Sequence, residues 1–134
     1  KTDGVHWHGP TSDAAKVWRE HHIAMLLSYR EGLPRALVEA AATGRPIIAT
    51  DVSGCRDVVR NGIEGLLVPN GDITVTAEAI VRLVNDAGMR RRMGASANAR
   101  FHKRYTEESV RQTIGELYRR CIIDAEKSGG AKAG

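Results

Sequence analysis

The chain has 134 residues, enough for one domain at most, and its 42% hydrophobic and 27% charged residues are ordinary for a globular protein. Its apolar runs are all shorter than the roughly 18 residues of a membrane-spanning helix, and its first residues lack the apolar stretch of a signal peptide. The net charge of +4 indicates anionic partners without identifying them. Because the chain begins without an initiator Met, we expect it to be a fragment of a longer protein.

The amino-terminal third of the chain predicts a strand, a helix and a second strand. Val5–Trp7 is a short strand candidate, and Thr11 or Ser12 can cap a helix that ends near Glu20. The continuous apolar run Ile23–Leu27 has the length of a buried strand. We expect both tryptophans of the chain to lie in the core.

The middle of the chain predicts two further strands with helical segments between them. A helix is expected over Pro34–Thr43, because Pro is favoured at the first helical position and Gly44 follows as a stop signal. The next elements are a buried strand at Ile47–Thr50, a short helical turn at Asp57–Arg60 and a strand at Leu66–Val68.

The last third of the chain predicts helices only, followed by a Gly- and Ala-rich tail. The expected helices run from a cap at Asp72 or Thr74 to Asn85, over Met89–Arg104, and from Thr106 to about Glu126. We expect residues 1–126 to form the folded domain and residues 127–134 to be a disordered tail.

Continuous apolar strands that alternate with helices predict an α/β fold, with a Rossmann-like parallel sheet and helices on both faces. Ligands of such sheets bind at the carboxyl ends of the strands. The loops Ser28–Pro34 and Asp51–Arg56 follow two of the predicted strands, so we expect the functional site there.

The stretch "EGLPRALVE", residues 31–39, carries the strongest site signal in the chain. Gly32 permits a tight turn and close approach of a ligand, and the free N–H groups at the start of the following helix form an anion site. Glu39 lies about one turn deeper, and its carboxylate suits the vicinal hydroxyls of a ribose. A phosphate at the helix start and a ribose beside Glu39 describe a bound nucleoside diphosphate. Glu31 can reach hydroxyls attached to the distal phosphate.

A purely structural interpretation of the same residues stays open. Arg35 and Glu39 are four residues apart and can form an ion pair on a helix surface, although this order of the charges is the weaker one. Glu31 can equally be a partner of the helix dipole.

The motif and its surroundings resemble the retaining glycosyltransferases of family 4, which have two Rossmann-like domains in the GT-B fold. "EGLPRALVE" is similar to the E-x7-E pattern of that family. The stretch "GRPIIATDVSGCRDVVRNGIEGLLVPNGD" resembles the family's Gly-x-Pro-hydrophobic-Ala-Thr-Asp-x-x-Gly segment and its Asn-Gly-x-x-Gly-Leu-Leu-Val hairpin. The resemblance covers about residues 4–120. It implies that the chain is an incomplete carboxyl-terminal, donor-binding half of such an enzyme.

The resemblance also assigns roles to the motif. Glu31 becomes the candidate catalytic residue, in contact with the transferred sugar, and Glu39 binds the ribose of the donor. The backbone amides of Gly32, Leu33 and Arg35 hold the diphosphate or the sugar. The family uses no metal or other cofactor, and its donor substrate is a nucleotide diphosphate sugar, here expected to be a UDP-sugar.

For the whole protein, the resemblance implies transfer of a hexose, with retention, to a polysaccharide or lipid-linked saccharide acceptor. The protein is then bacterial and cytoplasmic, at the inner face of the membrane, and acts in the biosynthesis of polysaccharide or lipopolysaccharide. We expect this chain alone to bind donor weakly and to be inactive. The alternative is a non-catalytic module that binds nucleotide or associates with itself.

In the family's usual strand order, the strands that flank Ile23–Leu27 on one side are missing from this chain. An unpaired strand edge recruits another strand. We therefore expect that Val5–Trp7 pairs with Ile23–Leu27, or that two chains form a homodimer along this edge.

Three weaker signals accompany the motif. His6 and His8 share a face of the first predicted strand, but no acid or Cys completes a set of metal ligands, so surface histidines are the simpler interpretation. The basic run of residues 89–104 fits a solvated helix face, with anionic lipid as an alternative. Nucleic acid is a weaker alternative, because aromatic residues are absent from most of that run. We expect Cys55 to be a packed small residue and not a nucleophile.

Overall fold

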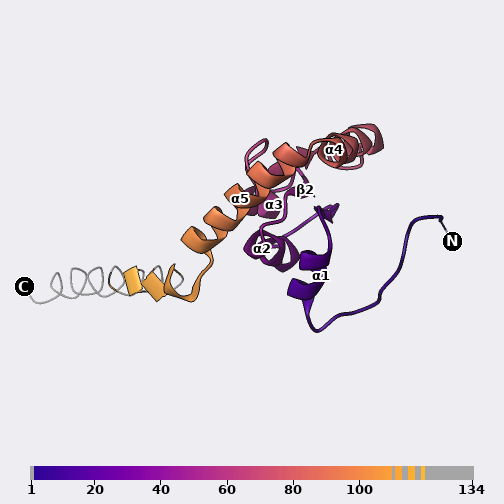
Figure 1. Ribbon diagram of the computed structural model, residues 1–134. Helices are drawn as coiled ribbons and strands as arrows, with labels where there is room; N and C mark the ends of the chain where they lie inside the picture. The colour runs from indigo at the N-terminus through magenta and orange to yellow at the C-terminus, as the bar shows by residue number, and fades with distance from the viewer. Residues whose placement is uncertain (1, 110, 113–114, 117–118, 120–134) are drawn as a thin grey trace, which may run out of the picture. The chain divides into compact units, whose positions relative to one another are not determined.

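The structure is a computed structural model and describes residues 2–109, 111–112, 115–116 and 119 (Figure 1). The chain divides into two compact units, Lys1–Arg100 and Phe101–Gly134, and each is described by itself. The three strands found in the described residues, and the predicted site motif, belong to the first unit.

The first unit is built on a three-stranded parallel sheet, as the sequence predicts. The strands β1 (Ala24–Leu26), β2 (Ile47–Thr50) and β3 (Gly65–Val68) lie in the order β1-β2-β3. The register pairs Ala24 with Ile47, and Ile47 with Gly65. All four residues of β2 are buried, which explains why its sequence is apolar from Ile47 to Ala49 and does not alternate.

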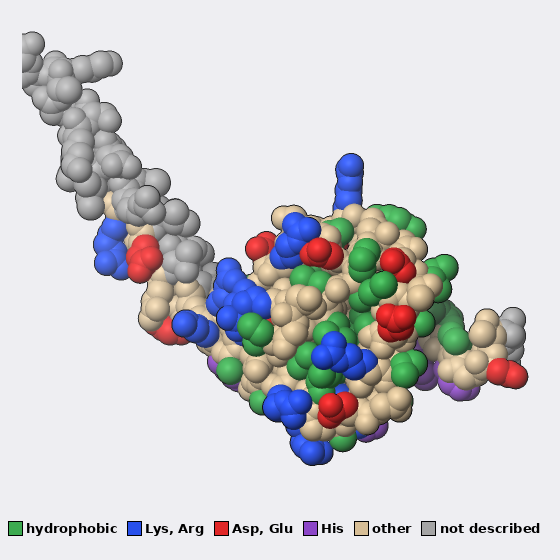
Figure 2. Space-filling model, turned by 90° about the horizontal axis from the view of Figure 1, so that it is seen from above, with side chains coloured by type: hydrophobic (Ala, Val, Ile, Leu, Met, Phe, Trp, Pro, Cys, Tyr) green, Lys and Arg blue, Asp and Glu red, His purple; other side chains and the backbone are tan. Residues whose placement is uncertain are grey.

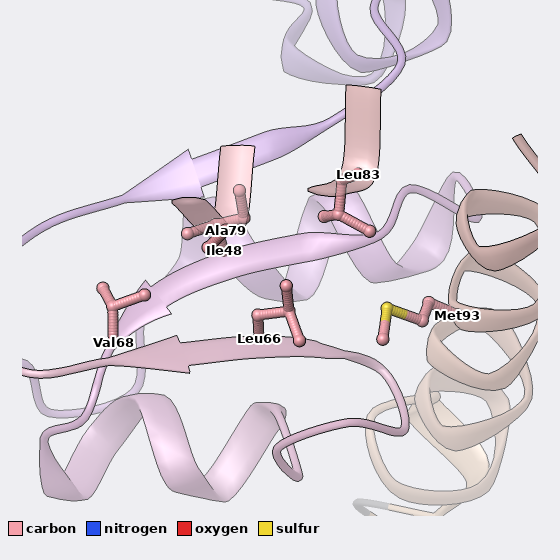
Figure 3. Close-up of a cluster of buried hydrophobic side chains, with 6 residues drawn as sticks. All are labelled: Ile48, Leu66, Val68, Ala79, Leu83 and Met93. Atoms are coloured by element: carbon pink, nitrogen blue, oxygen red, sulfur yellow. The ribbon is translucent and has the colours of Figure 1, made fainter. Parts of the chain in front are cut away.

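Helices cover both faces of this sheet. The first face packs against α4 (Ile73–Asn85), whose Leu83 lies in one buried cluster with Ile48 of β2 (Figure 3). Ile47 and Ala49 point to the opposite face and are also fully buried. That second face is covered by α2 (Arg35–Ala42) and α3 (Ser53–Val58), since right-handed crossovers place both connecting helices on one side.

The buried cluster of the first face joins two strands and two helices. Met93 brings α5 (Ala87–Arg104) into contact with it. Its buried members are Ile48, Leu66, Val68, Ala79, Leu83 and Met93, and Figure 3 shows their side chains converging between sheet and helices. The cluster has no aromatic member, in agreement with a core of aliphatic side chains.

The carboxyl end of α2 is fixed by its own sequence and by α5. Gly44 has φ +70°, its N–H donates to the carbonyl of Ala41 at 3.0 Å, and the N–H of Arg45 donates to the carbonyl of Ala40 at 3.0 Å. These two bonds form a Schellman motif, so the predicted stop at Gly44 is confirmed. The Asn98 side chain of α5 donates to the carbonyl of Ala42 at 2.8 Å.

Several helix starts differ from the sequence prediction, among them those of the first and third helices. The first helix, α1 (Ala14–Glu20), is capped by Asp13, whose carboxylate accepts from the Lys16 N–H at 2.9 Å, and not by Thr11 or Ser12. The third begins at Ser53 instead of Asp57, so much of the predicted Asp51–Arg56 loop is helical.

The predicted first strand is wrong. Val5–Trp7 has no strand conformation, and β1 pairs only with β2 among the described residues. Figure 1 shows no arrow in the segment before α1. The Trp7 side chain is 91% exposed, and the other tryptophan, Trp18, is half-buried. Neither belongs to the buried core, and Val5–Trp7 does not cover the edge of β1.

Two arginines of the basic run have structural partners. Arg90 donates to the carbonyls of Leu83 and Val84, both at 2.6 Å, at the carboxyl end of α4. Arg100 donates to the carbonyl of Asp57 at 3.1 Å. On the face drawn in Figure 2, Lys and Arg side chains are interspersed with acidic and hydrophobic ones.

In the second unit, the structure describes the end of α5 and part of the segment after it. The ring of Phe101 stacks on that of Tyr105, with centroids 6.5 Å apart. Thr106 accepts from the Ser109 N–H at 3.3 Å, which is a helix-capping contact. The rest of the predicted helix from Thr106 to about Glu126, and the predicted tail, lie largely or wholly outside the described residues.

Candidate functional site

The candidate site is the amino-terminal end of α2, which follows β1 at the carboxyl edge of the sheet. Pro34 is the N-cap residue and not the first helical residue as predicted, and its carbonyl accepts from the N–H groups of Leu37 and Val38. No side chain caps the helix, and its first turn carries no acidic residue. The N–H groups of Arg35 and Ala36 make no hydrogen bond within the described part of the chain. They are therefore free to bind an anion.

Gly32 precedes this helix start and lies on the surface. Its φ is not positive, so the backbone at Gly32 does not use the left-handed conformation that glycine permits. A Cβ atom added to Gly32 has nothing within 4 Å. The fold alone therefore does not demand a glycine, and the space beside Gly32 is open to a ligand. Leu33 is 54% exposed and the buried Pro34 side chain anchors the loop.

Glu39 lies in α2 between buried positions and is itself half-buried. The structural alternative, an ion pair with Arg35, is not formed: the ion pairs between described residues lie elsewhere. Arg35 is exposed. The carboxylate of Glu39 also makes no hydrogen bond to a described residue, so its oxygens are available as acceptors.

Glu31 lies on the loop before Gly32 and is half-buried. The pKa of the nearby Cys55 thiol is raised, mainly by burial of the thiol and in addition by the negative charge of the Glu31 carboxylate. Cys55 is fully buried in α3, which confirms the prediction that it is a packed residue. A raised pKa disfavours the thiolate and hence nucleophilic reactivity.

The loop that carries Glu31 and Gly32 rests on α3. A Cβ atom added to Gly54 would lie 1.8 Å from the carbonyl oxygen of Gly32 and 2.3 Å from that of Glu31. Gly54 has no role among the sequence-based predictions. A glycine in the first turn of a helix is the signal that could have found it, because nothing in helix formation calls for glycine there.

Further residues of the predicted site loops, and a cavity, lie near the carboxyl edge of the sheet. The side chain of Arg56 pairs with Asp51 at 2.6 Å on the surface, and Thr50 is buried at the end of β2. A largely apolar cavity of about 320 Å³ lies on the α4 side. Its lining includes Leu27, Tyr29 and Thr50, but none of Glu31, Gly32, Leu33, Arg35 and Glu39.

The predicted histidine pair shows no metal geometry of its own. His6 and His8 are exposed, with ring centroids 6.5 Å apart. The described residues contain no group of three or more His, Cys, Asp or Glu side chains placed to hold a metal ion. None of the helices in the described part combines the length and the hydropathy that crossing a membrane requires.

Two bacterial enzymes of sugar transfer are among the known proteins that are similar to this chain. A protein from Campylobacter jejuni, an N,N'-diacetylbacillosaminyl-diphospho-undecaprenol alpha-1,3-N-acetylgalactosaminyltransferase, is 31% identical over 118 residues, which cover 88% of this chain and 31% of that protein. The capsular polysaccharide biosynthesis glycosyltransferase CapM of Staphylococcus aureus is 28% identical over 115 residues, 86% of this chain and 30% of CapM. The chain thus spans about a third of the length of these relatives.

Solved structures agree in fold. Sucrose-phosphate synthase from Thermosynechococcus elongatus superimposes with a TM-score of 0.74 at 30% identity, over 81% of this chain and 27% of that one. TarM of Staphylococcus aureus, in complex with fondaparinux, alpha-GlcNAc-glycerol and UDP, gives 0.74 at 26% identity, over 81% and 22%. The parallel sheet with its helices is therefore part of a GT-B fold, and the predicted fold class is confirmed. The family model for glycosyl transferases group 1 matches residues 1–86, and the chain belongs to that family.

Proposed function

We propose that the chain is part of the donor-binding domain of a retaining glycosyltransferase of family 4, which takes a hexose from a UDP-sugar. The observation that carries the proposal is the start of α2. Two free backbone N–H groups and the unpaired Glu39 carboxylate lie within little more than one helical turn, and the open surface at Gly32 lies on the loop just before them. UDP occupies TarM, a relative in fold and sequence.

The start of α2 binds the diphosphate. The amides of Gly32, Leu33 and Arg35 lie at or just before the positive end of the helix dipole, where phosphate oxygens are favoured. No acidic side chain of the first turn competes with the ligand for that potential. When the sugar leaves, negative charge grows on the same phosphate oxygens, so fixed N–H donors stabilise the transition state more than the bound substrate.

The two glutamates bind the hydroxyl groups on either side of the diphosphate. Glu39, about one turn inside the helix, accepts from the ribose hydroxyls, and its half-buried position strengthens those bonds. Glu31, on the loop, accepts from hydroxyls of the transferred sugar and is the candidate catalytic residue. Retention means that the acceptor oxygen forms its bond to the anomeric carbon on the face from which the UDP oxygen departs. No metal takes part in this proposal.

The rest of the reaction belongs to a longer protein. The acceptor is a saccharide, free or lipid-linked, in the biosynthesis of bacterial polysaccharide or lipopolysaccharide. CapM and the Campylobacter relative carry names from polysaccharide and undecaprenol-linked chemistry, which supports this class of acceptor. The protein works in the cytoplasm at the inner face of the membrane. This chain alone binds donor weakly and does not transfer sugar.

Titration of the 15N-labelled chain with UDP tests the proposal. We expect the amide resonances of Gly32–Glu39 to shift in a saturable manner, because the diphosphate binds those N–H groups directly. Uridine, which lacks the diphosphate, serves as the control ligand and is expected to cause smaller shifts there. Shifts confined to other residues would contradict the assignment of the site.

Replacing Gly32 by alanine separates ligand binding from folding. We expect the thermal midpoint to stay close to that of the wild type, since the added methyl group meets open space and the φ of Gly32 is not positive. UDP affinity should fall, because the methyl group enters the volume assigned to the diphosphate. If Gly32→Ala binds UDP with the affinity of the wild type, the ligand does not bind at this face of the loop.

The exposed edge of β1 supports a second candidate function, self-association of the chain. Within the described residues β1 has a partner on one side only, and Met25 and Leu27 are 46% and 45% exposed. A free strand edge with apolar side chains pairs readily with a second chain.

We expect sedimentation to show a concentration-dependent homodimer of the chain. The substitution Met25→Lys places a charge on the edge and is expected to give a monomer of unchanged thermal midpoint. Val81→Lys, on the exposed face of α4, is the matched control. Equal dissociation in both variants would place the interface away from β1.

A further inference from the structure

Three buried glycines of the first unit share one property: their missing side chains make room for the backbone of another element. Gly54 of α3 faces the carbonyls of Glu31 and Gly32, Gly65 faces Ile47 of β2, and Gly94 of α5 faces Gly44. The contact of Gly94 lies beyond the carboxyl end of α2. The contact of Gly54 lies on the loop before its amino-terminal end, where the donor is proposed to bind.

The geometry points to Gly54 as a positioning residue of the donor site, a role that rests on the proposed function. The carbonyl oxygens of Glu31 and Gly32 lie within 2.3 Å of the position that a Cβ atom on Gly54 would occupy, so α3 packs directly against the loop on this side. The outer side of the same loop is open, since a Cβ atom on Gly32 meets nothing within 4 Å. The loop is therefore held on its inner side and free to meet a ligand on its outer side.

Any side chain at position 54 must displace the loop. Non-bonded Cβ contacts below 3.0 Å essentially never occur, so the 1.8 Å approach to the Gly32 oxygen has to open by about 1 Å or more. Both atoms in contact are backbone carbonyls, and no flexible side chain can yield instead.

The displacement falls on the loop and not on α3. Cys55 and Val58 of α3 are buried with 0% and 2% exposure, and Arg100 holds the carbonyl of Asp57 at 3.1 Å. Gly32 and Leu33 are exposed. The element with the fewer buried contacts moves.

The loop carries the groups whose positions matter most to the donor. Glu31 is placed to bind the transferred sugar, and the amides from Gly32 onward bind the diphosphate. The charge of Glu31 reaches the buried thiol of Cys55, which is a second sign that this carboxylate lies against α3. An outward shift of the loop separates these groups from Glu39, which is fixed in α2.

The experiment compares Gly54→Ala with Gly94→Ala in the 134-residue chain. Both substitutions force a methyl group onto a backbone carbonyl, at 1.8 Å and 2.1 Å, so both are expected to lower the thermal midpoint. UDP affinity is expected to fall at least about tenfold in Gly54→Ala, because a shift near 1 Å in binding groups is costly. In Gly94→Ala the affinity should stay close to that of the wild type.

A measurement without ligand tests the contact in the wild type, even if Gly54→Ala does not fold. We expect nuclear Overhauser contacts between the α-protons of Gly54 and protons of Glu31–Leu33. Their absence would overturn the inference, and so would equal UDP affinity in both folded alanine variants. If these Overhauser contacts are present but the wild-type chain binds no UDP, the proposed function is wrong. The role of Gly54 in donor binding would then be wrong as well.

Discussion

Replacing Glu64 by glutamine is expected to lower the free energy of unfolding by roughly 1.5–3 kcal/mol, the usual range for lost hydrogen bonds to a buried charged group. Glu64 is the last residue of the turn that leads into β3 and has 0% exposure. Its carboxylate accepts from the backbone N–H of Arg60 at 2.8 Å and pairs with the Arg60 guanidinium. A glutamine offers an NH2 group to donors that already point at it, so one of these bonds becomes a clash of donors.

The effect of this substitution depends on pH with a definite sign. Burial alone would raise the pKa of Glu64, but the hydrogen bonds from Arg60 and the charges of Arg60 and Arg100 outweigh it and lower the pKa. A lowered pKa stabilises the folded state above the unfolded pKa of about 4.3, and this stabilisation is lost as pH falls through the folded pKa. The wild type and Glu64→Gln should thus differ most near neutral pH and converge in acid.

Urea unfolding at several pH values measures both effects, and Glu78→Gln is the matched control. Glu78 is exposed on α4, so its substitution should change stability little at any pH. A stability difference between wild type and Glu64→Gln that stays constant from neutral to acid pH would mean that the buried charge is not its source.

The sheet could be predicted from sequence because its strands carry a signal that no other element shares. Ile47–Thr50 is four buried residues with no alternation, and the structure places the strand on those same four residues. The predicted strand Val5–Trp7 was wrong because its signal is only local. Three residues with an aromatic and a β-branched side chain match a strand locally, but pairing needs a partner, and the partner is not a property of the segment.

The helix start that carries the candidate site could be predicted from sequence, whereas the contact that supports the preceding loop could not. The start of α2 follows from Gly32, Pro34 and the alanine-rich run, and its free N–H groups follow from being a helix start. The contact between Gly54 and this loop joins two crossover connections, and no periodicity or spacing encodes it. The burial of Glu64 could not be predicted for a similar reason. Charged residues are seldom fully buried, so the sequence alone predicts that a glutamate in a turn is exposed.

Removal of the Glu39 carboxylate is the second change from which we expect a large effect. Glu39→Ala should weaken UDP binding by about 1–3 kcal/mol, because the ribose hydroxyls lose their acceptor within a partly dry site. The helix itself should not suffer, since Ala has the highest helix propensity and Glu39 has no ion pair or side-chain hydrogen bond among the described residues to lose. Unchanged thermal stability with reduced affinity is the expected combination.

The ribose contact can be isolated by changing the ligand and the protein together. Wild-type chain should prefer UDP to 2′-deoxy-UDP, whereas Glu39→Ala should bind the two alike, because the hydroxyl then has no partner to lose. Glu78→Ala, exposed on α4, should keep the wild-type preference. If Glu39→Ala discriminates between the two nucleotides as strongly as the wild type, the ribose does not lie beside α2. The half-buried carboxylate would then have a structural role, and the diphosphate at the helix start would have to be assigned without it.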